Sequence, residues 1–144
     1  MKTSLKILLV EDNEGDIMLT TETLNEASFD KELSVIKDGW EAVEYLEKKG
    51  KYNSICLPDL VLLDVNLPRL NGYEVLKKIR SNHNTCHIPV IMLTTSSSQK
   101  DIHLSIEHKA NFYMIKPVNS DQLVQMGESI NNFCQNIIRH NTPD

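Results

Sequence analysis

The chain has 144 residues, of which 40% are hydrophobic and 24% charged, and its formal net charge is -5 at pH 7. These values predict one globular domain with its own core, and they argue against nucleic-acid binding through bulk charge. No apolar run approaches the roughly 18 residues of a membrane span and the first residues do not form a signal peptide, so we expect a cytoplasmic protein without membrane contact.

Five short apolar runs, rich in branched or aromatic residues, predict strands. Each is followed by a capping residue with an acid or amide three positions later, which predicts a helix start. The runs are Ile7–Val10, Leu33–Ile36, Leu60–Leu63, Pro89–Leu93 and Phe112–Ile115, and the capping pairs are Asn13 with Asp16, Asp38 with Glu41, Asn71 with Glu74, Ser98 with Asp101, and Asn119 with Gln122.

Strict alternation of strands and helices predicts an α/β fold, in which helices cover both faces of a doubly wound parallel sheet. The more polar Leu33–Ile36 suits an edge strand, and Leu60–Leu63 suits a central one. No linker or repeat interrupts the pattern. We therefore expect a single domain over 1–144, with a core over about 5–138, a short polar tail and no output domain.

The last predicted helix carries an apolar stripe from Leu123 to Ile138. That stripe can pack on the sheet or form a homodimer, and both interpretations are open. The three cysteines, Cys56, Cys86 and Cys134, are widely spaced and contain no CxxC pair. Such spacing predicts small buried hydrophobic side chains and not a disulfide framework or a zinc site.

Polar residues follow four of the five predicted strands. Glu11 and Asp12 follow the first, Asp64 the third, Thr94 the fourth and Lys116 the fifth. Ligands of open parallel sheets bind outside the carboxyl ends of the strands, so these side chains share one rim. Taken singly, each has a simpler explanation, such as loop solvation or helix capping. Those explanations do not account for the presence of all these residues on one rim.

Three carboxylates at this rim would repel one another unless a cation lay between them. A hard cation such as Mg2+ binds to one or two carboxylates, a carbonyl and several waters, which leaves room for a phosphoryl oxygen. A carboxylate held there is a competent nucleophile toward phosphorus. Asp64 is therefore a candidate phosphoacceptor.

Four motifs give the chain a family resemblance. In the expected order, they resemble those of the receiver domains of two-component response regulators, over about Leu5 to Ile138. The long connection Lys48–Pro58 is most similar to that of stand-alone receivers partnered with cyanobacterial and bacterial phytochromes. The resemblance implies a flavodoxin-like sheet with strand order 2-1-3-4-5. The motifs are Val10–Asn13, Leu62–Gly72, Leu93–Thr95 and Ile115–Pro117.

The resemblance also implies a role for each rim residue. Asp64 would accept a phosphoryl group from a histidine of a sensor kinase. Asp12, Asp64 and the backbone carbonyl of Asn66 would bind Mg2+, and Glu11 would act through a bound water.

A second group of residues would stabilise and read out the phosphoryl group. Lys116 would pair with Asp64 and then with phosphoryl oxygens, aimed by a cis peptide before Pro117. Thr94 would hydrogen-bond the phosphoryl group, and Tyr113 would fill the space that Thr94 vacates. Without the resemblance, Tyr113 is an ordinary aromatic residue of an edge strand.

The signal would pass to a partner protein or to a histidine phosphotransfer protein, through the fourth helix, fifth strand and fifth helix. Lys109 is a departure from the family, because glycine usually ends the fourth helix in a left-handed conformation. The segment Gln99–His108 is only weakly amphipathic. Both features question the boundary of that helix.

Three other classes of protein are alternatives to a receiver. An aspartate-nucleophile phosphatase would need an acid two residues after Asp64, where this chain has Asn66, which cannot donate and recover a proton. A scaffold that is never phosphorylated would not need the set Asp12, Asp64, Thr94 and Lys116. A flavodoxin-type cofactor binder would need a glycine- or hydroxyl-rich phosphate loop after the first strand, and acids stand there instead.

Overall fold

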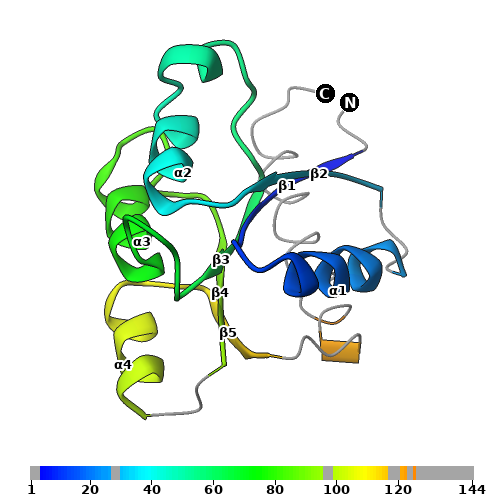
Figure 1. Cartoon of the computed structure of the whole chain (residues 1–144). Coiled ribbons are helices and arrows are strands. Elements are labelled where there is room, and N and C mark those ends of the chain that lie inside the picture. The colour runs from blue at the N-terminus through cyan, green and yellow to red at the C-terminus, as the bar shows by residue number, and fades with distance from the viewer. Residues whose placement is uncertain (1–3, 27–29, 96–98, 117–120, 123–124, 126–144) are drawn as a thin grey trace, which may run out of the picture.

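The computed structural model describes residues 4–26, 30–95, 99–116, 121–122 and 125. Within these ranges strands and helices alternate along the chain, as the sequence predicts (Figure 1). The elements are β1 (Leu5–Val10), α1 (Glu14–Asn25), β2 (Lys31–Ile36), α2 (Gly39–Leu46), a short 3-10 helix η1 (Gly50–Tyr52), β3 (Leu60–Asp64), α3 (Gly72–Ser81), β4 (Val90–Thr94), α4 (Gln99–Glu107) and β5 (Phe112–Ile115).

The five strands form one parallel sheet in the order β2-β1-β3-β4-β5. This confirms the predicted doubly wound sheet, with β3 at its centre and β2 at one edge. Since all neighbours run parallel, every strand points its carboxyl end toward the same rim. The register aligns Asp64 with Leu93 on one side of this rim, and Thr94 with Ile115 further along.

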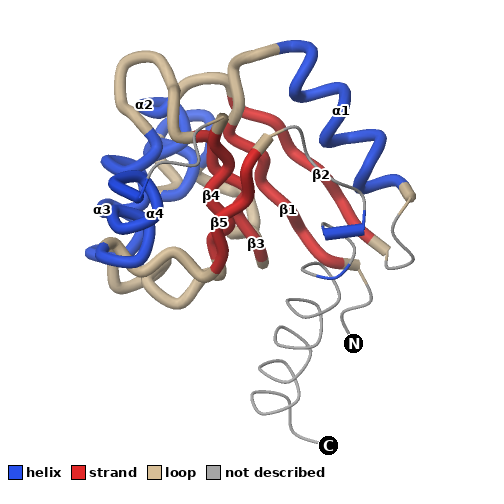
Figure 2. Tube along the Cα trace, turned by 90° about the horizontal axis from the view of Figure 1, so that it is seen from below, coloured by secondary structure: helices blue, strands red, loops and turns tan. Residues whose placement is uncertain are grey.

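Successive residues of the strands point to opposite faces of the sheet and pack in two separate core layers. On one face Leu8, Val61 and Leu63 pack with residues of α2 and α3, and on the other Leu9 and Leu62 pack toward α1. Figures 1 and 2 show α2, α3 and α4 on one side of the sheet and α1 on the other. The strands are apolar on both faces because both are covered.

Three predicted helix starts are confirmed. Asn13, Asp38 and Asn71 are extended, and each side chain accepts a hydrogen bond from the backbone N–H three residues on. Asn71 and Glu74 also form the reciprocal capping box. Asp16 holds the position in α1 that Glu74 holds in α3, but its carboxylate accepts a hydrogen bond from Lys116. The predicted caps Ser98 and Asn119 lie outside the described residues, as do Pro117 and the apolar residues of the stripe from Leu123 to Ile138.

The prediction of buried cysteines is wrong for Cys56 and Cys86, which are both free and exposed. Both lie in connections between elements, where the chain runs over the surface, and the Cys86 thiol faces the carbonyl oxygen of His83 at 3.6 Å. Cys134 lies outside the described residues. Within the described ranges, no helix has both the length and the apolar character needed to cross a membrane.

The end of α4 lies at the expected boundary, with Lys109 in the left-handed position where the family usually has glycine. The helix ends at Glu107, and Lys109 adopts a left-handed conformation with φ 65°. The Lys109 N–H donates to the carbonyl of Ile106 at 3.0 Å, and the Ala110 N–H donates to that of Ser105 at 2.9 Å. These two bonds define a Schellman motif in which lysine holds the position that glycine usually takes.

Candidate functional site

The predicted rim residues meet at the carboxyl ends of the strands. Glu11 follows β1, Asp64 ends β3, Thr94 ends β4 and Lys116 follows β5. Glu11, Asp64 and Thr94 are buried, with 1%, 3% and 1% of their surface exposed. Asp12 is exposed beside them. The fold therefore brings these predicted residues to one rim of the sheet.

Glu11, Asp12 and Asp64 form a cluster of carboxylates. One oxygen of each lies within 4.8 Å of the others. The Glu11 carboxylate also accepts a hydrogen bond from the Asn13 N–H at 3.3 Å. Hard oxygen donors that converge at such distances, one of them open to solvent, fit a divalent cation of the magnesium type.

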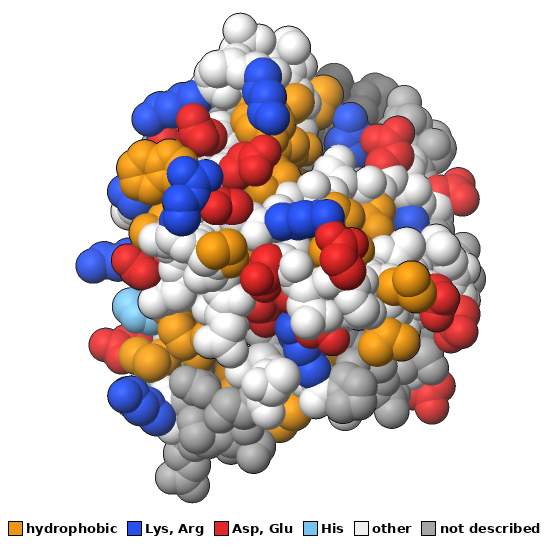
Figure 3. Space-filling view, in the orientation of Figure 1, with side chains coloured by type: hydrophobic (Ala, Val, Ile, Leu, Met, Phe, Trp, Pro, Cys, Tyr) orange, Lys and Arg blue, Asp and Glu red, His pale blue; other side chains and the backbone are white. Residues whose placement is uncertain are grey.

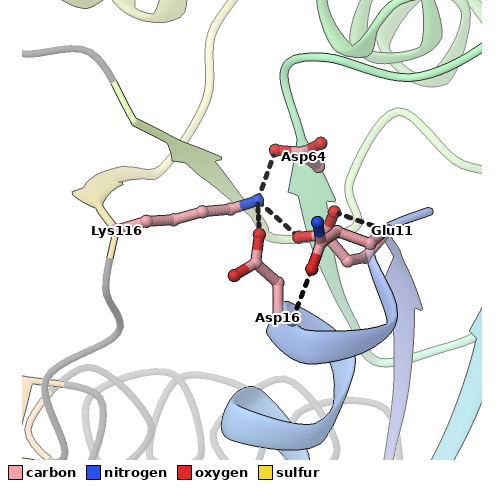
Figure 4. Close-up of polar contacts among 5 residues, drawn as sticks. Glu11, Asp16, Asp64 and Lys116 are labelled. Carbon is pink, nitrogen blue, oxygen red and sulfur yellow. Dashed lines mark hydrogen bonds and ion pairs between the residues drawn. The ribbon is translucent and has the colours of Figure 1, made fainter.

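Lys116 brings the compensating positive charge. Its ammonium lies 2.5 Å from Glu11 Oε1, 2.9 Å from Asp64 Oδ1 and 2.9 Å from Asp16 Oδ2. Figure 4 shows Lys116, just after β5, extending into the space between these three carboxylates. The side chain of Lys116 is 8% exposed, so these contacts are shielded from bulk water.

Burial sets the ionisation of this group. Burial raises the pKa of Glu11 and of Asp64 above their ordinary values, and the hydrogen bonds from Lys116 oppose it only in part. For Lys116, burial acts to lower the pKa, but the hydrogen bonds to Glu11, Asp64 and Asp16 outweigh it and the pKa rises. The Lys116 ammonium thus compensates only part of the negative charge at the rim. A bound cation would compensate the remainder.

The surrounding surface is of mixed charge. Among the described residues visible in Figure 3, acidic and basic side chains are interspersed and no broad basic patch covers this face. One ion pair on the rim joins Lys37, just after β2, to Glu14 in the first turn of α1.

Thr94 and Tyr113 occupy neighbouring strands. Thr94 is buried at the end of β4, and Tyr113 on β5 is aligned with Met92 in the register. Tyr113 is partly buried and packs against the core layer on the α2–α3 side. It is therefore a core-contacting residue of an edge strand. Asn66, two residues after Asp64, is exposed.

The loop after Asp64 is fixed to the rest of the fold. The Val65 N–H donates to the Leu93 carbonyl, and the Gly72 N–H donates to the Val65 carbonyl, both at 2.9 Å. Arg69 is left-handed, with φ 66°, and its Nε donates to Asp38 Oδ2 at 2.6 Å. These contacts hold the backbone on both sides of Asn66.

Asp16 is the residue of this site that sequence reasoning missed. The sequence assigned it only to the start of α1, as partner of Asn13. The available signal was a carboxylate in the first helical turn behind an acidic strand end, where its side chain can face the same rim. The distance to Lys116, which is 100 residues away in the chain, depends on how α1 lies against the sheet.

Comparisons with known proteins agree with this geometry. Residues 7–128 match the response regulator receiver domain family. Response regulator Rcp1 of Synechocystis sp. (strain ATCC 27184 / PCC 6803 / Kazusa) is 40% identical over 127 residues, which are 88% of this chain and 86% of that protein.

Two solved structures are similar over most of the chain. The phosphorylated cyanobacterial phytochrome response regulator RcpA has a TM-score of 0.79 and 41% identity, covering 92% of this chain and 94% of its own. The Mn2+-bound form of response regulator Rcp1 has a TM-score of 0.77 and 40% identity, covering 90% and 93%.

The strand order, the buried aspartate with its lysine partner, and the match over residues 7–128 all point the same way. The chain belongs to the response regulator receiver domain family, the phosphoacceptor proteins of two-component signalling.

Proposed function

We propose that Asp64 is the residue that accepts the phosphoryl group, and that a histidine of a sensor kinase donates it. The observation that carries this proposal is the contact of buried Asp64 with Lys116 beside two further carboxylates. A single buried carboxylate could be structural. A buried carboxylate that shares a lysine with two other acids, at the rim where ligands bind, is better explained by chemistry on a charged group.

In the proposed reaction, an oxygen of Asp64 forms a bond to phosphorus while the bond from phosphorus to the histidine nitrogen of the kinase breaks. The nitrogen keeps the bonding electrons, and the histidine leaves as neutral imidazole when its second ring nitrogen carries a proton during the transfer. Asp64 must attack as the carboxylate. Lys116 favours that form, because its ammonium lies 2.9 Å from Asp64 Oδ1.

The residues that would hold Mg2+ are Asp12, Asp64 and the backbone carbonyl of Asn66, with Glu11 acting through a water. When bound, the cation would offset the charge of the carboxylates and of the phosphoryl oxygens. The choice of Mg2+ rests on the all-oxygen donor set and on the solvent access at Asp12, which leaves the ion its waters.

Thr94 and Lys116 act on the phosphoryl group after transfer. The Thr94 hydroxyl would donate a hydrogen bond to one phosphoryl oxygen, and the Lys116 ammonium would contact another. Drawing Thr94 toward Asp64 would free space beside β5, into which Tyr113 would turn. Phosphorylation would then favour one of two existing arrangements, and a partner protein would bind that arrangement.

The partner of the phosphorylation step is proposed from similarity. RcpA is a cyanobacterial phytochrome response regulator, so we propose a phytochrome-type histidine kinase as the donor for this chain. Phosphotransfer from such a kinase, purified in its two light states, would test this choice. A downstream partner protein or histidine phosphotransfer protein, a homodimer through the last helix, and a cytoplasmic location remain predictions.

The test of the proposed function is the intact mass after incubation with acetyl phosphate, with and without Mg2+. We expect the wild-type chain to gain one phosphoryl group only with Mg2+, and Asp64→Asn to gain none. Asp59→Asn is the matched control, because Asp59 lies just before β3 and its carboxylate accepts a hydrogen bond from the Lys6 N–H, remote from the rim.

Other outcomes separate the alternatives. Rapid consumption of acetyl phosphate without any mass gain would favour an aspartate-nucleophile phosphatase, although Asn66 lacks the acid that such enzymes use. Neither mass gain nor consumption would favour a scaffold that is not phosphorylated. Labelling of Asp64→Asn at the wild-type level would reject Asp64 as the phosphoacceptor.

A further inference from the structure

Lys116 has no spare hydrogen-bond donor in this structure. An ammonium group carries three N–H donors, and three carboxylates lie within 2.9 Å of the Lys116 nitrogen. They come from three different elements, since Glu11 follows β1, Asp64 ends β3 and Asp16 lies in the first turn of α1 (Figure 4). Lys116 can therefore contact a phosphoryl oxygen only if one of these contacts weakens.

The three contacts are not equally easy to give up. Glu11 is 1% exposed, so release from Lys116 would leave a buried carboxylate without its cation, which is costly. Asp64 is the residue proposed to carry the phosphoryl group, so the Lys116 ammonium must stay close to Asp64 in order to reach that group. The side chain of Asp16 is 32% exposed, and water can replace the lysine there.

We propose that Asp16 is a positioning residue that holds the Lys116 ammonium at α1 and competes with the phosphoryl group for it. This inference rests on the proposed function of Asp64. In the unphosphorylated protein Asp16 fixes the lysine on the α1 side. When Asp64 is phosphorylated, the Asp16 contact breaks and the freed donor turns to a phosphoryl oxygen. Asp16 thereby limits how tightly the phosphoryl group is held.

A simpler explanation for Asp16 is the favourable position of an acid at the positive end of a helix. Glu14 offers the matched control for that explanation. It lies in the same first turn of α1 and carries the same charge, but it pairs with Lys37 and is 74% exposed. Glu14→Gln and Asp16→Asn each remove one negative charge from this turn. Only the second removes a charged partner of Lys116.

The experiment measures the affinity for beryllofluoride, which mimics a phosphoryl group on a carboxylate, at saturating Mg2+. The Mg2+ affinity of each variant is determined separately, so that a change in metal binding is not misread. We expect Asp16→Asn to bind beryllofluoride roughly threefold or more tightly than both the wild type and Glu14→Gln, as when a partly exposed ion pair no longer competes. Asp16→Glu keeps the charge and should restore an affinity near that of the wild type.

A second readout follows Lys116 directly, by the NMR signal of its ammonium group without beryllofluoride. That signal should change in Asp16→Asn and stay unchanged in Glu14→Gln, whereas a purely structural role of Asp16 would not single out this lysine. Equal affinities of Asp16→Asn and Glu14→Gln, or weaker binding by Asp16→Asn, would overturn the proposal. A wild-type chain that binds no beryllofluoride would instead reject the proposed role of Asp64, and this inference with it.

Discussion

Gly72 lies so close to Asp64 that no side chain fits between them. A Cβ on Gly72 would stand 2.2 Å from the carbonyl oxygen of Asp64 and 2.8 Å from the Cα of Val65. Both neighbours are backbone atoms and cannot swing aside. The first residue of α3 thus packs directly on the backbone that carries the candidate phosphoacceptor.

We therefore expect Gly72→Ala to lower the free energy of unfolding by at least about 2 kcal/mol, because the α3 terminus must move away from β3. Mg2+ affinity should fall as well, since Asp64 moves with the strand end. Chemical denaturation and metal titration measure the two effects. Gly50→Ala is the control, because its Cβ would meet no atom within 4 Å and only its φ of 58° is unfavourable, at about 1 kcal/mol. Equal losses in the two variants would show that the close approach to Asp64 is unimportant.

A second prediction concerns the charge of Asp64. Because burial raises its pKa above the ordinary value of 3.8, the ionised carboxylate destabilises the metal-free protein at neutral pH. As pH falls through the raised pKa of the folded state, protonation removes this penalty. We expect Asp64→Asn to be more stable than the wild type at pH 7 in a chelator. The difference should shrink as the solution is acidified toward the ordinary value.

Thermal unfolding of the wild type and Asp64→Asn across this pH range measures the difference in stability. Added Mg2+ should then stabilise the wild type more than the variant, because it binds the folded state through the carboxylate that the variant lacks. Asp59→Asn serves again as the control away from the rim. A variant less stable than the wild type at pH 7 would mean that the ion pair with Lys116 outweighs the burial of Asp64.

Much of the site could be predicted because it depends on strand ends. A parallel sheet brings the residues at the carboxyl ends of β1, β3, β4 and β5 to one rim whatever the details of packing, so the placement of Glu11, Asp64, Thr94 and Lys116 follows from the alternation of strands and helices. The contact between Asp16 and Lys116 does not, since it depends on where α1 lies across the sheet.

Several features of the loops could not be predicted from the sequence either. Arg69 meets Asp38 only because two connections, 31 residues apart in the chain, approach each other over the rim. Cys56 looked like a core residue by its type, but it lies in a surface connection. Lys48 takes a left-handed conformation with φ 56° after α2, although lysine gives no local signal for it. In these places tertiary packing overrides residue preference.

Arg80 supports a third prediction. From the end of α3 its guanidinium donates to the carbonyl oxygens of Ile88 at 2.7 Å, Lys109 at 2.9 Å and Cys86 at 3.3 Å, and to the side chain of Asn111 at 3.0 Å. Burial lowers the pKa of Arg80, and no carboxylate is among these acceptors. One side chain thus joins the loop before β4 to the connection between α4 and β5.

Arg80→Met removes these hydrogen bonds while keeping an unbranched apolar stem. We expect a loss of about 2–3 kcal/mol in the free energy of unfolding, because several acceptors are left unsatisfied. Amide exchange at Asn111, whose N–H donates to the Val90 carbonyl, should accelerate. Lys77→Met, an exposed position on the same helix, should change stability by less than about 0.5 kcal/mol. Unchanged exchange at Asn111 would contradict a role of Arg80 in fixing this connection.

The last prediction concerns the two lysines that end helices in a left-handed conformation. After α2, the Lys48 N–H donates to the Tyr45 carbonyl and the Lys49 N–H to the Glu44 carbonyl, which is the same Schellman pattern that Lys109 completes after α4. A side chain at this position strains the backbone, and glycine relieves the strain but makes the unfolded chain more flexible. We expect Lys48→Gly and Lys109→Gly each to raise the free energy of unfolding by about 0.5–1 kcal/mol in chemical denaturation. Lys77→Gly, within α3, is the control and should lower the free energy of unfolding by about 1 kcal/mol. A loss of similar size at all three positions would show that Lys48 and Lys109 are not strained by their left-handed conformation.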